Sequence, residues 1–557
     1  MRAIRFMPRR SRLPGTAVGA VILAAGTGVG VQAATSARAA PAQPPACAVG
    51  TTVQTAAGPV CGITVNGVNE WLGIPYAAPP VGPLRWQPPQ PHAPWTTALR
   101  ATAYGSECTQ PVSLTAPVPT AGSESCLFVN VWAPAGADGS SALPVLVHIH
   151  GGGFIVGSGA SDNTLLARTG HEVIVSMNYR LGIFGFLADT ALGPHSGDYG
   201  LQDQQAALRW VQQNVTAFGG DPNNVTIFGE SAGGSSVCDQ IASPTAAGLF
   251  ERGISTSGEY GGLLGIPGPA FALESQDCKA ALPSQAQADS IGASFAAAVR
   301  CGPGTANVAA CLQKVPTAEV TTAAGFGYQY AGHGTIAPTI NGSTLTMTLR
   351  QALKTGKVNR VPVIAGTDRD ENLIALPTTP SQYQAAVVAQ YGKFAPQVLA
   401  RYPLSRFYSP FVAFRTVAAD SDTVCPALIT DRDLARWMPV YGYEIDEGDA
   451  PPAVFEPANE PNGSYHVAAW FLNPVSPALD ANLQVLQNEE VADVTTFART
   501  GNPSAENTPD WPQFKPPGEV MSLAPGGDSQ VMSIAQVEQD HDCGFWDKIA
   551  PGPDHGT

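Results

Sequence analysis

The stretch "VTIFGESAGGSS" occupies residues 225–236 and joins a run of strand-forming residues to a serine enclosed by glycines. Its first four residues favour an extended strand, and the small residues after the serine are compatible with a helix. A sharp strand-to-helix turn leaves no room for Cβ atoms two residues before and two residues after its central residue. Because Gly229 and Gly233 meet this demand, the sequence predicts a Gly-x-Ser-x-Gly turn that exposes the Ser231 hydroxyl.

Further short apolar runs, rich in β-branched residues, predict the buried strands that would surround this turn. Segment 198–215 has helical periodicity and lies between two of them. Strands that are apolar on both faces and separated by helices are typical of a mostly parallel central sheet flanked by helices. The segments at about 258–345 and 375–435 lack this rhythm, so we expect large helical or irregular insertions that form a pocket wall. The predicted strands are 143–150, 172–179, 224–229, 361–366 and 439–445.

Composition indicates a large acidic globular protein. The chain has 557 residues, of which 44% are hydrophobic, so an extensive core is expected. The formal net charge is −15. Nucleic acids and anionic membranes are bound by basic surfaces, so we expect neither as a partner.

The first 39 residues have the layout of a secretory signal. Several arginines precede an apolar run from about Thr16 to Val31, and small-residue cleavage sites follow near residues 33 and 39. A membrane anchor is the alternative, but the run is short and rich in glycine. We therefore expect residues 1–39 to be a signal peptide and 40–557 to be one large secreted domain without a stable membrane anchor. The export route and the cleavage site stay open.

Ten cysteines in an exported chain indicate disulfide bonds rather than metal ligands. Sequence spacing favours three local pairs, Cys47–Cys61, Cys108–Cys126 and Cys301–Cys311. Spacing alone cannot pair the remaining four, Cys238, Cys278, Cys425 and Cys543.

An exposed serine becomes a strong nucleophile only with a base, an orienting acid and donors for the oxyanion. The motif "HIHGGGF" at 148–154 follows a predicted strand and can supply the donors. Its glycines let the N–H groups of Gly152 and Gly153 approach a substrate oxygen, and the N–H of Ala232 is the third candidate. A phosphate-binding loop is disfavoured because no Lys-Ser/Thr pair follows the glycines.

The base should lie downstream of the serine and the acid, because hydrolases with a Gly-x-Ser-x-Gly turn carry their catalytic residues in the chain order Ser, acid, His. His466 follows the last predicted strand in a loop that enters an apolar segment, so we favour it as the base. His541 is adjacent to Cys543, where a disulfide would give it a structural role. The other two downstream histidines are His333 and His555.

The acid is expected in "AGTDRDEN" at 365–372, directly after a predicted strand. Asp368, Asp370 and Glu371 compete for the role, and spacing does not choose among them. The alternative role for these carboxylates is to cap the next helix.

Beyond these residues, the chain resembles a type-B carboxylesterase of the cholinesterase-like α/β-hydrolase family. The matching motifs follow one another in the family's order over nearly the whole of 40–557. They are "LGIPYAAPPVGPLRWQPP" (72–89), "ESCLFVNVW" (124–132), "HGGGF" (150–154), "NYRLGIFGFL" (178–187), "GDYGLQDQQAALRWVQQNV" (197–215), "FGGDPNNVTIFGESAGG" (218–234), "AGTDRDEN" (365–372), "FARTGNPS" (497–504) and "CGFWD" (543–547).

The resemblance implies an α/β-hydrolase fold and a serine carboxylic-ester hydrolase that acts on small-molecule esters without a metal or cofactor. By the family's motifs, the nucleophile is Ser231, the acid is Glu371 and the base is His466. The oxyanion donors fall on Gly152, Gly153 and Ala232.

The resemblance also implies the bridges Cys108–Cys126 and Cys425–Cys543, which leaves Cys238–Cys278 by subtraction. Two positions depart from the family pattern: Asn372 replaces the glycine after the acid, and Ala469 replaces a glutamate that follows the histidine. The loop between Cys108 and Cys126 has no aromatic residue, which argues against the cation–π site of a choline esterase.

Three alternatives share part of this pattern. An interfacial lipase would use the same residues but needs a large apolar lid. A non-catalytic binding protein of the family would normally lack the serine or the histidine. An amidase, or a hydrolase for one specialised ester, would differ only in the shape of its pocket. The sequence leaves acyl and alcohol specificity and the oligomeric state open.

Overall fold

One large sheet dominates the computed structural model, which describes residues 45–113, 116–258, 278, 282–325, 336–370, 377–446 and 481–549. All of these residues belong to the unit Pro45–Thr557. The sheet that they form has 11 strands in the order β16-β15-β14-β13-β12-β11-β9-β10-β8-β4-β3. The strands are β3 (Ile63–Val65), β4 (Val68–Pro75), β8 (Phe128–Pro134), β9 (Leu143–Ile149), β10 (Val173–Met177), β11 (Gly220–Glu230), β12 (Arg252–Thr256), β13 (Val363–Asp368), β14 (Val440–Ile445), β15 (Glu519–Leu523) and β16 (Gln530–Ser533).

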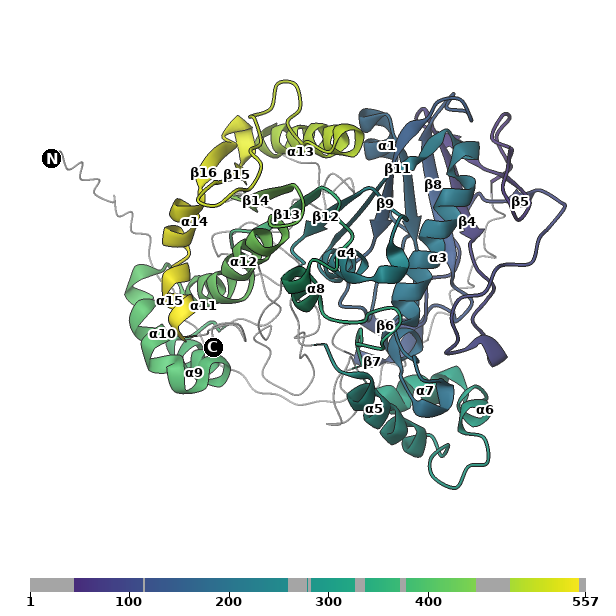
Figure 1. The fold of residues 1–557 in the computed structure, drawn as a ribbon, viewed down its shortest axis with the longest axis horizontal. Coiled ribbons are helices and arrows are strands. Elements are labelled where there is room, and N and C mark those ends of the chain that lie inside the picture. Colours follow the sequence, from purple (N-terminus) through teal and green to yellow (C-terminus); the bar gives the residue numbers. More distant parts are fainter. Residues whose placement is uncertain are drawn as a thin grey trace, which may run out of the picture. The chain divides into compact units, whose positions relative to one another are not determined.

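The strands from β15 to β10 run parallel, and antiparallel strands extend the sheet at both ends. Helices cover both faces (Figure 1). This arrangement confirms the predicted fold class. Two smaller sheets are also present among the described residues, formed by β1 (Val53–Gln54), β2 (Pro59–Cys61) and β5 (Leu99–Arg100), and by β6 (Gln110–Ser113) and β7 (Ala116–Ala121).

Successive side chains of each parallel strand point to opposite faces of the sheet, so a strand can contribute to the hydrophobic clusters on both faces. In β9, Val145 and Val147 belong to the hydrophobic cluster on one face, whereas Leu146 belongs to the cluster on the other. All three side chains are fully buried. Burying one such side chain stabilises the fold by about 1.5–3 kcal/mol, which explains why these strands are apolar at successive positions.

The helices fall into two groups according to the face that they cover. Residues of α3 (Tyr199–Asn214), α4 (Ala232–Ala242), α8 (Leu349–Thr355) and α12 (Cys425–Leu434) contribute to the first cluster. Residues of α1 (Thr164–Gly170) and α13 (Ala481–Thr500) contribute to the second cluster. The predicted helix at 198–215 is α3, with nearly the same bounds.

The two segments without strand rhythm contain most of the remaining helices. The first holds α5 (Gln285–Ala298), α6 (Val308–Leu312) and α7 (Thr317–Ala324), and the second holds α9 (Pro380–Tyr391), α10 (Ala395–Arg401) and α11 (Pro410–Ala418). Two of these helices, α5 and α9, begin with a capping box, and in α5 Ser284 and Gln287 satisfy each other's backbone N–H groups. The C-terminal helices are α14 (Ile534–Asp540) and α15 (Cys543–Ile549), and α2 (Gly182–Phe186) is a short helix before α3.

Ten cysteines form five disulfide bonds: Cys47–Cys61, Cys108–Cys126, Cys238–Cys278, Cys301–Cys311 and Cys425–Cys543. These are the pairs that spacing and family resemblance together led us to expect. The Cys425–Cys543 bond joins α12 to α15, so it fastens the C-terminal helices to a helix that packs on the sheet.

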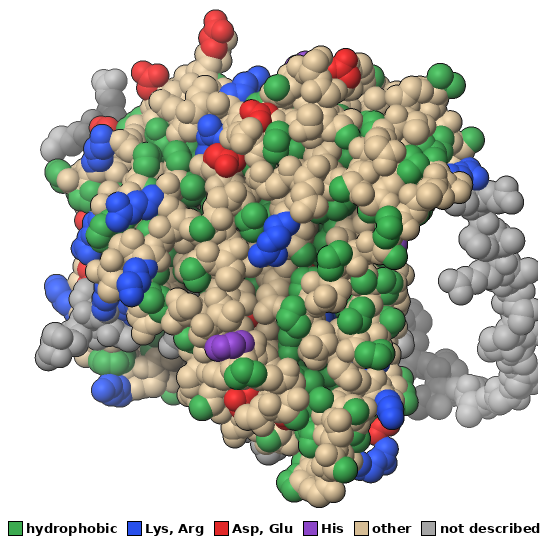
Figure 2. Space-filling model, turned by 45° about the vertical axis from the view of Figure 1, so that its right-hand side comes forward, with side chains coloured by type: hydrophobic (Ala, Val, Ile, Leu, Met, Phe, Trp, Pro, Cys, Tyr) green, Lys and Arg blue, Asp and Glu red, His purple; other side chains and the backbone are tan. Residues whose placement is uncertain are grey.

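Charged side chains are scattered among uncharged ones on the face drawn in Figure 2. None of the helices in the described part of the chain is both long enough and apolar enough to span a bilayer.

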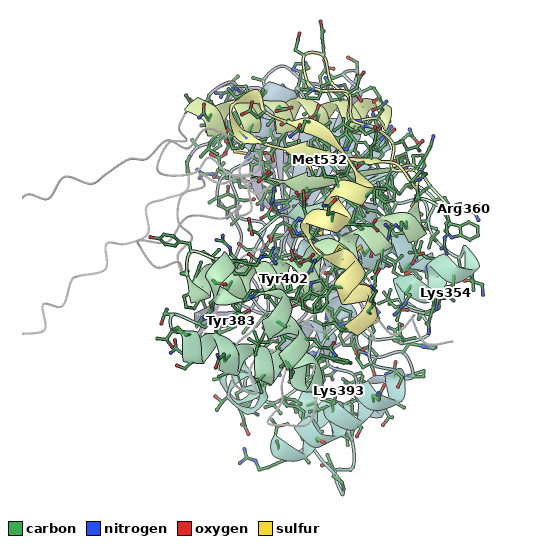
Figure 3. All side chains as sticks on the ribbon, turned by 90° about the vertical axis from the view of Figure 1, so that its left-hand side faces the viewer. Lys354, Arg360, Tyr383, Lys393, Tyr402 and Met532 are labelled. Carbon is green, nitrogen blue, oxygen red and sulfur yellow. A yellow bond between two sulfur atoms is a disulfide. The ribbon has the colours of Figure 1, made fainter. Side chains whose placement is uncertain are left out.

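A buried ionic network fastens the C-terminal helices to the sheet. The His541 Nδ1 lies 2.6 Å from Asp420 Oδ1, and its Nε2 lies 2.8 Å from Glu444 Oε2 on β14. Tyr402 donates a hydrogen bond to Asp420 and accepts one from the Trp546 indole. Tyr402 lies beside the yellow C-terminal helices in Figure 3.

Burial disfavours the imidazolium of His541, but its hydrogen bonds to Asp420 and Glu444 and their negative charges outweigh this effect and raise its pKa to about 10. His541 therefore has a structural role, as expected from its position beside Cys543.

We expect His541→Gln to lower the free energy of unfolding by about 3–5 kcal/mol near neutral pH, because it leaves two buried carboxylates without their cation. Because the pKa of His541 is higher in the folded state than in the unfolded state, the charged imidazole contributes its full stabilisation below pH 6.5, the unfolded-state pKa. This contribution is lost as pH rises through about 10. Urea unfolding between pH 6 and pH 10 would measure both effects. His92→Gln, outside the network, is the control, and equal losses in both variants would contradict the assignment.

Candidate active site

Ser231 occupies a strained backbone position between β11 and α4. Its φ is 56° and its ψ is −124°, a conformation that L-residues rarely adopt. Such conformations cost about 1–3 kcal/mol and are concentrated at functional sites. The residue is partly exposed, whereas nearly all of α4 behind it is buried. The turn therefore presents the hydroxyl at the carboxyl edge of the sheet and at the N-terminus of a helix, as the motif predicts.

The two flanking glycines are required by contacts with the neighbouring strand. A Cβ added at Gly229 would lie 2.5 Å from the carbonyl oxygen of Ile149 at the end of β9, and one at Gly233 would lie 2.1 Å from the same oxygen. Both distances are shorter than any van der Waals contact. Since the obstacle is backbone, a side-chain rotation cannot relieve it.

We expect Gly233→Ala to destabilise the fold by about 1–3 kcal/mol and to reduce esterase kcat by about 100-fold or more, because the turn must shift to accommodate the methyl group. Thermal unfolding and steady-state kinetics would measure the two effects. Gly544→Ala, where the added Cβ meets open space in α15, is the control. Unchanged kcat in Gly233→Ala would contradict the steric argument.

The glycine loop after β9 lies directly against Ser231. A Cβ on Gly151 would be 3.2 Å from the Ser231 Cβ. Gly152 and Gly153 have φ values of 98° and 68°, in the region that favours glycine. Within the described residues, no acceptor takes a hydrogen bond from the N–H groups of Gly152, Gly153 or Ala232. The loop and the turn thus place backbone N–H groups beside the serine.

Two aromatic residues hold the start of this loop. The His150 ring stacks on Tyr179 with a centroid distance of 4.3 Å, and its Nδ1 lies 2.8 Å from the carbonyl oxygen of Gly151. The Tyr179 hydroxyl donates to the carbonyl of His150 at 2.9 Å. Burial lowers the pKa of His150 to about 4 and that of His148 to about 3, so both are neutral at pH 7. The family motif included Tyr179, but sequence reasoning gave it no role.

The far end of the loop is tied to the segment closed by Cys108–Cys126. The Gln110 side chain donates to the carbonyl of Gly157 and accepts from its N–H, at 3.0 and 2.8 Å. A buried ion pair between Arg85 and Glu124 further fixes this segment. The loop is therefore held at both ends before any substrate binds.

We expect Tyr179→Phe to reduce kcat by about three- to tenfold while leaving KM nearly unchanged. The variant keeps the stacked ring but loses one hydrogen bond, worth about 1 kcal/mol, that positions the glycine loop. Tyr383→Phe removes a similar buried hydroxyl, which donates to the carbonyl of Tyr402 among the insertion helices, and is the control. Equal kinetic effects in both variants would contradict a positioning role.

The segment in which the acid is expected leaves the sheet at the same edge as Ser231. Glu230 pairs with Thr256 of β12, and Thr256 pairs with Gly366 of β13, so the carboxyl ends of these strands are level. Asp368 is fully buried at the end of β13. Parallel strands are about 4.8 Å apart, which places this strand end about 10 Å from β11.

The expected acid, Glu371, and the expected base, His466, lie outside the described residues. The same holds for four other residues considered above: His333, His555, Asn372 and Ala469. Among the residues that the structure does describe, no group of three or more His, Cys, Asp or Glu is arranged to hold a metal ion.

This fold, with a strained serine and a glycine loop at the carboxyl edge of a parallel sheet, defines an α/β-hydrolase. Comparison with known proteins narrows the class. A model of the carboxylesterase family matches residues 49–398. The chain is 34% identical over 509 residues to para-nitrobenzyl esterase of Bacillus subtilis (strain 168), covering 83% of this chain and 92% of that protein. It is 32% identical over 491 residues to fumonisin B1 esterase of Sphingopyxis macrogoltabida, covering 84% and 85%.

A solved structure of a PNB esterase has a similar fold, with a TM-score of 0.70 and 30% sequence identity over 88% of this chain and 99% of that one. The chain therefore belongs to the carboxylesterase family and is an ester hydrolase.

Proposed function

We propose that the protein is a secreted serine carboxylic-ester hydrolase with the triad Ser231, His466 and Glu371. The observation that carries this proposal is the strained Ser231 with the N–H groups of the glycine loop beside it. Family motifs supply the base and the acid. Small-molecule esters are the proposed substrates, in line with the names of the similar esterases.

In the proposed mechanism, Ser231 Oγ attacks the ester carbonyl while His466 accepts its proton. Glu371 orients the imidazole and stabilises its charged form. The tetrahedral intermediate collapses, His466 protonates the departing alcohol, and an acyl-enzyme remains on Ser231. Water then loses a proton to His466, attacks the acyl carbon and releases the acid, which restores the serine.

The oxyanion of both tetrahedral intermediates would be bound by the N–H groups of Gly152, Gly153 and Ala232. Each important donor contributes about 3–4 kcal/mol to lowering the barrier. The donors are preorganised because Tyr179 and Gln110 fix the loop, so little reorganisation is needed during the reaction.

Secretion is part of the proposal. Five disulfide bonds are typical of proteins that mature in an oxidising compartment. The signal-like pattern of residues 1–39 points to the same compartment.

Ser231→Ala should reduce hydrolysis of p-nitrophenyl esters by roughly 10⁴-fold or more while the thermal unfolding midpoint stays close to that of the parent. Mass spectrometry should detect an acyl adduct on the parent after rapid acid quenching, and none on the variant. Ser294→Ala, at a partly exposed serine of α5, is the control. Retained turnover in Ser231→Ala would refute the assignment of the nucleophile.

A further inference from the structure

A pocket of about 430 Å³ lies at the outer edge of the sheet, away from Ser231. It is bounded by β3, β4, the first turns of α1 and Tyr104, which follows β5. Strand β4 is labelled near this edge of the sheet in Figure 1. None of its lining residues belongs to the serine turn or to the glycine loop. The pocket is thus distinct from the proposed ester site.

The side of this pocket formed by β4 carries a carboxylate where the strand pattern calls for an apolar residue. Val68, Glu70 and Leu72 alternate along β4, and Val68 and Leu72 belong to the hydrophobic cluster that includes α1. Glu70 points to the same face and is only 8% exposed. The Thr164 hydroxyl, at 3.1 Å, is the single donor that the described residues offer to its carboxylate, and its one proton is shared with the closer Asp162 Oδ1. Burying a carboxylate with so few partners is unfavourable.

One further carboxylate, that of Asp162, increases the negative potential in the pocket. Asp162 lies at the rim and accepts from the backbone N–H of Thr164. Burial, and then the charge of Asp162, raise the pKa of Glu70, although the hydrogen bond from Thr164 opposes them. Burial and the charges of Glu70 and Asp162 raise the pKa of Tyr104 to about 12. A bound cation would relieve the repulsion between the carboxylates of Glu70 and Asp162 and would offset the cost of burying Glu70.

The rest of the lining is mostly apolar or aromatic, with Asn66 and Arg168 as its polar members. Val65 and Tyr104 are 36% and 40% exposed, among the most exposed large hydrophobic side chains of the described residues. Leu72 and Leu165 add buried and half-buried aliphatic surface. Arg168 lies one helical turn beyond Thr164 on α1, so it would repel a cation from that end and direct it towards Glu70.

We propose that this pocket binds a small organic ammonium ion with one compact apolar group. The ammonium would donate hydrogen bonds to the carboxylates of Glu70 and Asp162. The apolar group would lie against Leu72 and Leu165, which line the pocket together with Tyr104. The volume accommodates a ligand of one aromatic ring and a short chain.

Isothermal titration calorimetry of the whole protein with 2-phenylethylammonium tests the proposal, and 2-phenylethanol is the neutral analogue of the same shape. Saturable binding of the ammonium and much weaker binding of the alcohol are expected. Glu70→Gln keeps the size of the side chain and an acceptor for Thr164 but removes the charge. Its affinity should fall about tenfold or more, because hydrogen bonds to charged groups are the strong ones.

Glu519→Gln, an exposed carboxylate on β15, is the control and should bind as the parent does. Asp162→Asn should weaken binding by a smaller factor, and it decides the question if Glu70→Gln fails to fold. Absence of saturable binding, equal binding of the alcohol, or unchanged affinity in the charge-removing variants would overturn the proposal. An ammonium that bound in the ester site would give the last of these results. The readout is independent of turnover, so it does not depend on the triad assignment.

Discussion

The contact between the backbone of the serine turn and the carbonyl oxygen of Ile149 is the constraint on which the site depends. It brings α4 so close to the end of β9 that no Cβ fits at Gly229 or Gly233. The same closeness places the glycine loop, which follows β9 directly, beside the serine. Ser231, the proposed nucleophile, and the glycine loop proposed to bind the oxyanion are therefore positioned by one packing contact between two neighbouring parallel strands and a helix.

Sequence patterns predicted much of this arrangement because the relevant signals are local. The apolar runs that form β9, β10, β11, β13 and β14 were recognisable since these strands are buried on both faces. Strand β12, with the sequence RGIST, was not predicted, because a short run with glycine and polar residues has no periodicity to reveal it. Its burial comes from neighbours on either side, which are distant in sequence.

In the site, too, features with a local sequence signal could be predicted, whereas features that depend on distant residues could not. Glycine spacing identified the turn and the donor loop, since each is a contiguous motif. The role of Tyr179 depends on a hydrogen bond to a residue on another strand, and the charge on His541 depends on carboxylates far away in the chain. Contacts between residues so far apart in the chain leave no local pattern in the sequence, so neither the role of Tyr179 nor the charge on His541 could be predicted. Glu70 is intermediate: a carboxylate at an inward position of a strand is visible in the sequence, but its pocket is not.

The position of Ser231, the proposed nucleophile, is set by main-chain atoms, which has a consequence for protein engineering. Libraries that randomise side chains around the proposed catalytic centre should change which esters fit without moving the Ser231 oxygen, as long as the two glycines are kept. The chain therefore offers a scaffold in which substrate range can be altered separately from chemical competence.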